Sequence, residues 1–378
     1  MRSGIIKVIA GALLPLVMFN PITSYVYRTL LFGDSSSLQK HDVSYVMFDY
    51  DEPMAIHKAS HKSYLASIKE KKAPPHQGKF EYSRPEPAYL GWNTTVDENE
   101  TEFDEYTVYL SKNKDMKNAE KYTTTDSEIK IYNVFIGETY YWYVEGEYDG
   151  DIYKSEVSSF KTEPEAPRNL YIDGVTNARD MGGWDCDGGK VKQGMIYRTA
   201  RLHNDEETNI TDDGVKTMLD KLGVKTEIDL RYDVTPRENG VLGEKVKYIV
   251  LPMDFSDDMM LDEVQAGYIR DFFKILADKN NYPVFFHCSI GTDRTGVCAF
   301  LLNGLLGVCE DDLYRDYGFS NFGFIGGERD GHNITHYIEL LDKYKGDTLK
   351  DRIAEYLISI GVTEGEISSI RKIMIGTK

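Results

Sequence analysis

The sequence predicts a multidomain protein in which an all-β sandwich is followed by an α/β domain with a largely parallel central sheet. Two observations lead to this prediction. In residues 77–163, short stretches of alternating apolar and polar residues are separated by turn-forming clusters, as in a β-sandwich. After Pro164 and Pro167 the pattern changes to strands that alternate with amphipathic helices, which is typical of a parallel sheet covered by helices.

The composition is that of an ordinary globular protein. The chain has 378 residues, of which 41% are hydrophobic and 28% charged. At roughly 150 residues per domain, this length allows two or three domains. The formal net charge is −18, so the overall field repels nucleic acid and anionic lipid. We therefore expect no nucleic-acid partner.

The N-terminal segment, residues 1–33, has the form of an export signal. Arg2 and Lys7 introduce an apolar run over residues 8–19, and a basic start followed by about 7–15 apolar residues is typical of secretory signals. The run is shorter than the roughly 20 residues that span a bilayer, although apolar residues resume over 22–32. We expect an exported protein, secreted or anchored at the cell surface by this segment, which would be its only membrane contact. A buried N-terminal helix of a cytosolic protein is the alternative.

Residues 34–76 predict a linker or stalk, because they are mixed and polar. They contain a lysine-rich patch at 69–72 and two consecutive prolines, Pro74 and Pro75. One helix is expected near residues 59–71. No residues in this segment indicate chemistry.

The sandwich segment has the alternation expected of half-buried strands, most clearly in residues 106–110 and 140–144. Its details resemble a fibronectin type III domain. Leu90-Gly-Trp92 is similar to the strand with the core tryptophan, Tyr140 to the corner tyrosine, and residues 158–162 to the closing strand. The resemblance implies a spacer or docking module, and a surface protein or a glycan is the partner that a docking module would bind.

Residues 168–378 predict the α/β domain. Thr211 is a candidate helix N-cap, and Thr363 with Glu366 fits a capping box. A helix that is apolar on nearly every side is expected to be buried. Helices are predicted at 211–223, 266–277, 297–306 and 363–373, and strands at 224–230 and 284–286.

The loop between the buried strand and the buried helix carries the chemistry. Its sequence is His287-Cys-Ser-Ile-Gly-Thr-Asp-Arg-Thr-Gly296, at a helix N-terminus, where backbone N–H groups bind anions and lower the pKa of a thiol. A thiolate at Cys288 is a nucleophile for covalent catalysis. Arg294 can donate two parallel hydrogen bonds to phosphate oxygens as charge builds in the transition state. The loop therefore predicts phosphoryl transfer through a phosphocysteine.

The other loop residues are expected to support the same reaction. We expect His287 to order the loop and tune the thiolate. Thr295 is placed to donate a hydrogen bond to the thiolate as it leaves, or to cap the helix. Beside Arg294, the predicted phosphate-binding residues are Ser289, Ile290, Gly291, Thr292 and Asp293.

The domain 168–378 resembles the bacterial tyrosine-phosphatase family whose loop has the sequence H-C-x-x-G-K-D-R-T-G. Several family motifs occur here in the family's order, beginning with the opening motif N-x-R-D-x-G-G. The matching segments are Asn177-Ala-Arg-Asp-Met-Gly-Gly183, Ile196-Tyr-Arg-Thr199, Asp229-Leu-Arg231, and the acidic Asp311, Asp312 and Asp316 with Tyr317.

This resemblance implies removal of phosphate from phosphotyrosine in a protein or peptide, and in some members from phosphoserine, phosphothreonine or phosphoinositides. It implies no metal and no other cofactor. One position departs from the family, because its loop lysine is Thr292 here. The missing positive charge beside the phosphate weakens the phosphoinositide interpretation and leaves monoester cleavage intact.

Three further residues of the family motifs have structural as well as functional interpretations. Arg179 and Asp180 are expected to brace the loop by hydrogen bonds rather than to touch substrate. Asp229 is either a buried structural carboxylate or a member of the site.

The leaving group needs a proton, so a carboxylic acid must lie within hydrogen-bond reach of it. Asp293 is the first candidate, because the family has a site aspartate at this position. Its neighbour Arg294 would lower its pKa, which is unfavourable for an acid. Asp254 follows a strand end upstream and is the second candidate. Asp229 is the third.

Two alternatives to an active phosphatase remain open. The loop could hold a buried cysteine and an arginine in a structural salt bridge. The chain could also be a surface interaction protein in which an inactive, phosphate-binding relative of the phosphatase fold serves as scaffold. We expect no structural disulfide, because two of the four cysteines lie in or beside an apolar helix and the nucleophile must stay reduced. The four are Cys186, Cys288, Cys298 and Cys309.

Overall fold

The computed structural model describes residues 41–66, 81–204, 208–232 and 240–377. The predicted export signal, residues 1–33, lies outside them. Within these residues no helix is both long and apolar enough to cross a membrane. The chain forms two compact units, interleaved along the sequence, and each is described by itself. The first contains Gly91–Ile129, Tyr141–Ser158 and the residues up to Phe48, and the second contains Asp49–Leu90, Lys130–Tyr140 and Ser159–Lys378.

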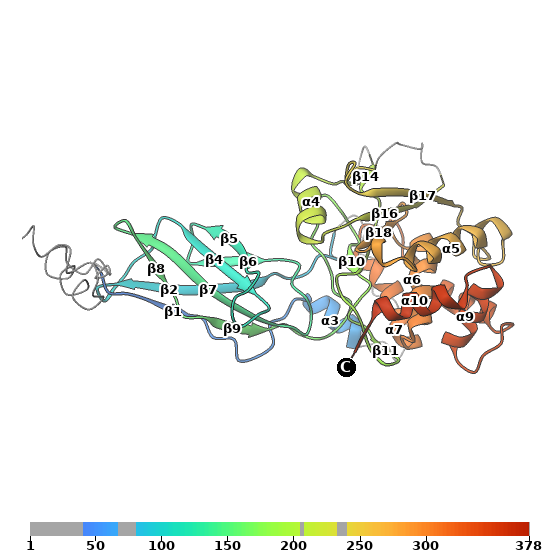
Figure 1. Ribbon diagram of the computed structural model, residues 1–378, viewed down its shortest axis with the longest axis horizontal. Helices are drawn as coiled ribbons and strands as arrows, with labels where there is room; N and C mark the ends of the chain where they lie inside the picture. The colour runs from blue at the N-terminus through green and yellow to red at the C-terminus, as the bar shows by residue number, and fades with distance from the viewer. Residues whose placement is uncertain (1–40, 67–80, 205–207, 233–239, 378) are drawn as a thin grey trace, which may run out of the picture. The chain divides into compact units, whose positions relative to one another are not determined.

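Two β-sheets build the region around the first unit (Figure 1). Trp92 of one sheet meets Tyr106 and Trp142 of the other, with ring centroids 5.1 and 6.2 Å from Trp92, and all three side chains are buried. The strands alternate between inward apolar and outward polar residues because successive side chains point to opposite faces. One sheet contains β1 (Val43–Met47), β2 (Ala88–Val96), β3 (Asn99–Glu100) and β6 (Glu128–Ile131); the other contains β4 (Tyr106–Ser111), β5 (Glu120–Thr124), β7 (Thr139–Tyr148), β8 (Asp151–Lys154) and β9 (Ser158–Lys161).

The central sheet of the second unit has five strands in the order β10-β13-β18-β16-β17. The pairs β13–β18, β18–β16 and β16–β17 are parallel, and β10 is antiparallel to β13. The middle strand is buried on both faces, which suits its continuous apolar sequence. The strands are β10 (Arg179–Asp180), β13 (Ile196–Thr199), β16 (Thr226–Arg231), β17 (Lys247–Met253) and β18 (Val284–His287).

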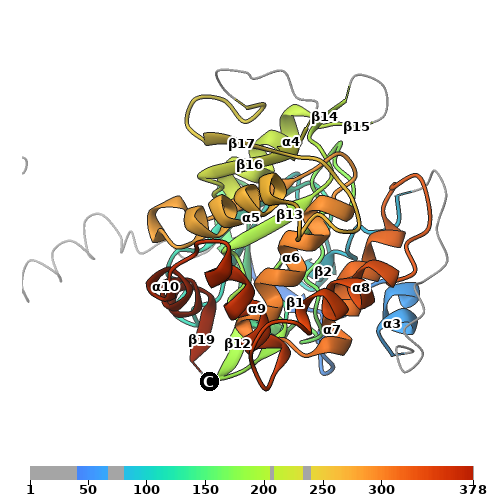
Figure 2. The same ribbon diagram turned by 90° about the vertical axis from the view of Figure 1, so that its right-hand side faces the viewer.

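Helices cover both faces of this sheet. Val284 and Phe286 belong to the larger core, with α5, α6, α9 and α10 (Figure 2), whereas Phe285 faces a smaller core with α4 and the π-helical turn Thr217–Lys221. The predicted helices at 266–277 and 297–306 are confirmed, and both begin earlier than expected. The helices are α3 (Ala59–Ala66), α4 (Asp212–Lys216), α5 (Glu263–Leu276), α6 (Asp293–Leu306), α7 (Glu310–Phe319), α8 (His332–Leu341), α9 (Leu349–Ser359) and α10 (Glu364–Met374).

Short elements complete the second unit. A small sheet joins the chain end to the start of the domain, because β12 pairs with both β11 and β19. The remaining elements are β11 (Asp185–Cys186), β12 (Gly189–Val191), β14 (His203–Asn204), β15 (Thr208–Asn209), β19 (Ile375–Thr377), and the 3-10 turns η3 (Lys279–Asn281) and η4 (Ser320–Phe322).

The segment expected to be a linker contains folded elements. Strand β1 pairs with β2, and α3 belongs to the second unit. His61 and Tyr64 of α3 are buried against the rings of Phe319 and Phe322. The linker prediction is therefore wrong for β1, whereas the helix expected near residues 59–71 is present as α3. A helix with only two buried side chains has a weak amphipathic pattern, and its role depends on partners far along the chain.

Candidate active site

The predicted nucleophile lies at the start of a buried helix. Strand β18 ends at His287, and α6 begins at Asp293, so the loop between them ends at the helix N-terminus. Cys288 is 1% exposed. Gly291 has a φ of 71°, and a Cβ there would lie 2.3 Å from the carbonyl oxygen of Thr199. Glycine is required at this point because both the backbone angle and the space exclude a side chain.

The surroundings of Cys288 favour the thiolate. Burial by itself would raise the pKa of this thiol. The charge of Arg294 and hydrogen bonds from the hydroxyl and N–H of Thr295 outweigh burial, so the pKa of Cys288 lies below its ordinary value. The Thr295 hydroxyl is buried and has no hydrogen-bond partner apart from this thiolate among the described residues. The geometry suits a nucleophile that is ionised before substrate arrives.

The Arg294 guanidinium is held at the mouth of the loop. Nη1 donates to the carbonyl of Met253 at 3.2 Å, and Nη2 donates to Ser289 Oγ at 3.0 Å. The first contact ties the loop to the end of β17. The side chain is partly exposed, so N–H groups remain for an anion.

Asn177 fixes the loop from the opening motif. Its backbone is left-handed, with a φ of 58°, and its amide nitrogen donates to the carbonyl of Ile290 at 3.0 Å and to Thr292 Oγ1 at 3.3 Å. Arg179 donates to Asn177 Oδ1 at 2.6 Å and so orients the amide. The predicted bracing role of Arg179 agrees with these contacts, although it acts through Asn177.

A buried carboxylate, Asp316, joins two arginines beneath the loop. Arg179 Nε lies 2.8 Å from Oδ1, and Arg198 Nη1 lies 2.5 Å from Oδ2. Arg198 Nη2 also donates to the carbonyl of Gly291 at 2.8 Å. Burial would raise the pKa of Asp316, but the two arginines hold it below its ordinary range. The loop therefore rests on a buried network of three charges.

Asp180 has a different place from the one predicted. It accepts hydrogen bonds from Arg168 and from the backbone N–H groups of Gly182 and Gly194. None of these contacts reaches the phosphate loop, so the bracing role expected for Asp180 is corrected. A carboxylate next to Arg179 in sequence points to the other side of its short strand, because side chains alternate along β10.

His287 lies in a buried acidic setting under the loop. Its Nε2 is 3.1 Å from Glu227 Oε1, and its Nδ1 is 3.9 Å from Asp229 Oδ1. Burial lowers the pKa of His287, but these two carboxylates raise it above its ordinary value. Glu227 was not predicted as a site residue. The sequence did contain a signal for Glu227, because an acidic residue within a strand that is otherwise buried needs a buried partner.

Asp229, the third candidate acid, is fully buried. Arg231 donates to it from Nε and Nη2, and Tyr248 donates its hydroxyl at 3.0 Å. These contacts occupy the Asp229 carboxylate and favour its interpretation as a buried structural carboxylate.

The other two candidate acids differ in their partners. Asp254 is exposed directly after Met253, and its backbone N–H donates to Gln265 Oε1 at 2.9 Å. Asp293 is in an ion pair with Arg329, which lies on the loop between η4 and α8. Arg329 was not predicted, because it is 36 positions from its partner and belongs to no motif.

Thr292 is fully buried, and its hydroxyl contacts the Asn177 amide. A lysine introduced at this position would have to leave this setting or displace Asn177. The structure therefore gives Thr292 a part in holding the loop.

Among the described residues, no group of three or more His, Cys, Asp or Glu side chains could hold a metal ion. All four cysteines are free thiols.

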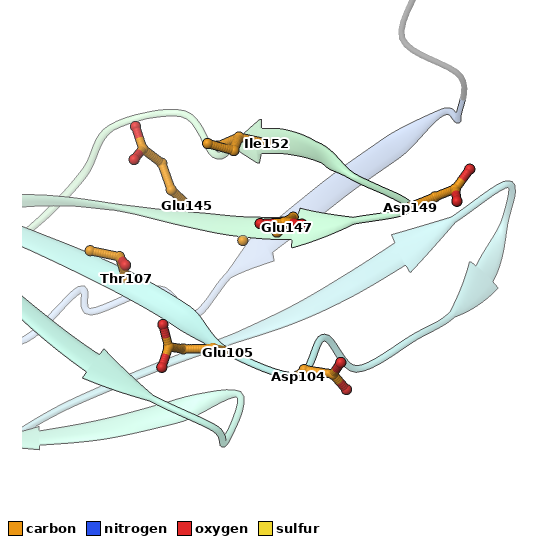
Figure 3. Close-up of a pocket in the computed structure, with 8 residues that line it drawn as sticks. Asp104, Glu105, Thr107, Glu145, Glu147, Asp149 and Ile152 are labelled. Carbon is orange, nitrogen blue, oxygen red and sulfur yellow. The ribbon is translucent and has the colours of Figure 1, made fainter.

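A separate acidic cleft of about 430 Å³ lies in the first unit (Figure 3). It opens between the ends of β4, β7 and β8, and Ile152 is the exposed apolar residue beside it. The cleft concentrates negative charge and would attract basic groups. Its carboxylates are Asp104, Glu105, Glu145, Glu147 and Asp149.

Comparison with known proteins gives one family and several similar chains. The model described as the tyrosine phosphatase family matches residues 170–375, which is more than half of the chain. A protein of Cupriavidus necator, provisionally named a tyrosine-protein phosphatase, is 27% identical over 199 residues, covering 44% of this chain and 70% of the relative. A tyrosine-protein phosphatase of Nostoc commune is 30% identical over 129 residues, covering 29% of this chain and 44% of the relative.

Two solved structures are also similar. The core catalytic domain of the PP-IP phosphatase SIW14 from S. cerevisiae, in complex with citrate, has 19% identity and a TM-score of 0.29. It covers 38% of this chain and 80% of its own. A second structure of the Siw14 catalytic core has 16% identity and a TM-score of 0.26, covering 38% of this chain and 86% of its own.

Proposed function

This chain belongs to the tyrosine phosphatase family, and we propose that it is a cysteine-dependent phosphatase that cleaves phosphate monoesters through a phosphocysteine. The observation that carries the proposal is the loop before α6. At this helix N-terminus, a Cys288 thiol of lowered pKa lies beside the guanidinium of Arg294, which makes two hydrogen bonds within the protein and is partly exposed for an anion.

The reaction has two steps. The Cys288 sulfur forms a bond to phosphorus while the bond from phosphorus to the ester oxygen breaks, and that oxygen takes a proton from an acid. Water then attacks the phosphocysteine, gives its proton to the same group, and releases phosphate and the thiolate. Arg294 and the loop N–H groups bind the three phosphate oxygens throughout, and the Thr295 hydroxyl stabilises the departing thiolate.

We propose phosphotyrosine in a protein or peptide as the substrate. The family and the names of both relatives support this choice. Position 292 has a threonine where the family has a lysine. This argues against phosphoinositides, because polyanionic substrates favour added positive charge. Phosphoserine, phosphothreonine and phosphoinositides are the other outcomes that a substrate panel can give.

We further propose that the chain is exported and that residues 77–163 form a fibronectin type III-like module. Support for export comes from the sequence of residues 1–33. Support for the module comes from its two antiparallel sheets around Trp92, and from Tyr140, whose hydroxyl accepts a hydrogen bond from the backbone N–H of Phe135 at 2.9 Å. Such a module would space the catalytic unit or dock it to a surface protein or glycan.

Phosphate release by the full chain tests the proposed function. Cys288→Ser should lower turnover of a phosphotyrosine peptide by at least about 10³-fold, because the hydroxyl is a far weaker nucleophile at neutral pH. Arg294→Lys should also lose turnover, because an ammonium group cannot donate two parallel hydrogen bonds to the phosphate as a planar guanidinium does. Lys350→Ala, far from the loop in sequence and paired with the exposed Asp187, is the control. Turnover that survives in Cys288→Ser, or no turnover in the wild type with any phosphoester, would favour the inactive scaffold.

A further inference from the structure

Arg329 holds the carboxylate of Asp293 with a two-pronged ion pair. Its Nε lies 2.9 Å from Oδ1 and its Nη2 lies 3.1 Å from Oδ2. This fork is the strong form of an arginine–carboxylate contact. The Tyr317 hydroxyl adds a longer contact of 3.4 Å to Oδ1. Both oxygens of Asp293 are therefore occupied, and protonating either would break part of the pair.

Arg329 is itself fixed in place. The fully buried Asn321 accepts a hydrogen bond from the Arg329 backbone N–H at 2.8 Å and donates to its carbonyl at 2.7 Å. Nη1 donates to the carbonyls of Gly327 and Glu328. Such a guanidinium is preorganised, because its backbone and side chain are both restrained.

The pair lies where it affects the thiolate. Asp293 is the first residue of α6, and its charge raises the pKa of Cys288. The hydrogen bond to Asp293 is the main cause that raises the pKa of Arg329, and the Cys288 thiolate adds to it. Arg329 therefore offsets a negative charge beside the nucleophile. The loop has no lysine at position 292 that could do the same, because this residue is a threonine.

We propose that Arg329 is a positioning residue that holds Asp293 as a fixed carboxylate, so that the leaving group takes its proton from Asp254. Asp254 is exposed, and its carboxylate forms no ion pair with another described residue. It directly follows Met253, whose carbonyl accepts a hydrogen bond from Arg294. This places Asp254 on the chain segment at the mouth of the site. The inference rests on the proposed function and reverses the order of candidate acids expected from the sequence.

A comparison of leaving groups tests the source of the proton. The two substrates are a phosphotyrosine peptide, whose phenol has a pKa of about 10, and nitrophenyl phosphate, whose phenol is much more acidic. Asp254→Asn should lose roughly 10²–10⁴-fold in kcat/KM on the peptide and much less on nitrophenyl phosphate. Asp293→Asn and Arg329→Met should lose the same factor on both. Asp257→Asn, in the same loop as Asp254, should show no selective loss.

The pKa of Cys288 tests the positioning role without turnover, and can be measured from the rate of alkylation against pH. The charged groups that act on this thiol are Arg294, Asp293, Arg329 and the buried Arg198. Arg329→Met should raise the pKa because Asp293 is left uncompensated. Arg329→Lys should restore part of the shift. In the double variant Asp293→Asn with Arg329→Met, the two effects should cancel.

The chain offers a matched control in Arg315. Its ion pair with Asp312 has the same exposed fractions as that of Arg329 with Asp293, namely 27% for the arginine and 16% for the aspartate. Arg315→Met should therefore change neither the leaving-group ratio nor the thiol pKa.

Two results would overturn the inference. A selective loss in Asp293→Asn, or in Asp257→Asn, would assign the acid elsewhere. An unchanged Cys288 pKa in Arg329→Met would remove the positioning role. If Arg329→Met does not fold, Arg329→Lys and Asp293→Asn still decide both questions. Failure of the proposed function is distinct, because it would leave no turnover that depends on Cys288.

Discussion

Single carboxylates decide the shape of the phosphate loop. Asp316 binds two arginines that reach the loop, one through Asn177 and one through the carbonyl of Gly291. Three buried charges are tolerated only because each has partners, and removing one leaves the others uncompensated. The loop is therefore sensitive to a residue that touches no substrate.

Asp316→Asn should destabilise the protein by about 3–5 kcal/mol, the usual cost of breaking a buried ion pair. Asp312→Asn removes a carboxylate four positions earlier on the same helix, from a partly exposed pair, and should cost about 0–1 kcal/mol. Denaturant unfolding of both variants measures the difference. Equal losses would contradict the role given to Asp316.

The buried pair of His287 and Glu227 predicts a pH dependence of stability. The folded-state pKa of His287 is raised. Its contribution is therefore complete below the unfolded value of about 6.5 and is lost as pH rises through the higher folded pKa. The free-energy difference between wild type and Glu227→Gln should be largest below about pH 6.5 and shrink as the pH rises above that value. Asp258→Asn, which removes the exposed partner of His336, should show no such trend.

At the scale of elements, the join between β18 and α6 requires glycine. Gly291 has a left-handed backbone and almost no space, whereas Gly223 has a similar φ of 64° and open space within 4 Å of the point that a Cβ would occupy. Gly223→Ala should therefore cost only the roughly 1–2 kcal/mol of the backbone angle. Gly291→Ala should cost more and also lower kcat, because the loop must move. Thermal unfolding and phosphatase assays of the two variants give the comparison.

The elements with local signals were predictable. The Thr363–Glu366 capping box and the Thr211 N-cap are both present, and α6 is buried on nearly all sides as its sequence indicates. Strand β10 was not predicted, because its two residues are a charged pair, Arg179 and Asp180, whose burial depends on distant partners. Helices α8 and α9 have ordinary amphipathic patterns but were not predicted.

The residues of the candidate site show the same difference between local signals and distant partners. The loop from His287 to Gly296 was predictable, because its chemistry lies in ten consecutive residues. Arg198, Glu227 and Arg329 were not assigned roles, because their partners come from other elements and only the fold brings them together.

At the scale of the whole molecule, the catalytic unit extends beyond the segment that matches the family. It includes α3, and the hydroxyl of Ser83, which accepts a hydrogen bond from the backbone N–H of Asn177 at 3.1 Å. Glu81 contacts the Thr176 hydroxyl beside it. Helix α3, Glu81 and Ser83 all lie well before residue 170, where the family match begins. They support the same asparagine that holds the phosphate loop.

A fragment of residues 168–378 should therefore be less stable than the full chain. It loses the cover of Phe319 and Phe322 and the support of Asn177, and burying one large apolar side chain contributes about 1.5–3 kcal/mol. We expect a lower unfolding temperature and a lower kcat than for the full chain. In the full chain, His61→Ala should reproduce part of both effects. A fragment as active and stable as the full chain would contradict this.

The interleaving of the two units bears on how the chain folds during synthesis. Residues 49–90 leave the ribosome early, whereas their partners, such as Tyr314, Phe319 and Phe322, follow more than 200 positions later. Contacts of such separation close slowly, since a long intervening chain must first be ordered. Tyr64 and Leu65 therefore remain without their apolar partners while the strands of the first unit are made, and transiently exposed hydrophobic surface of this kind is what chaperones bind.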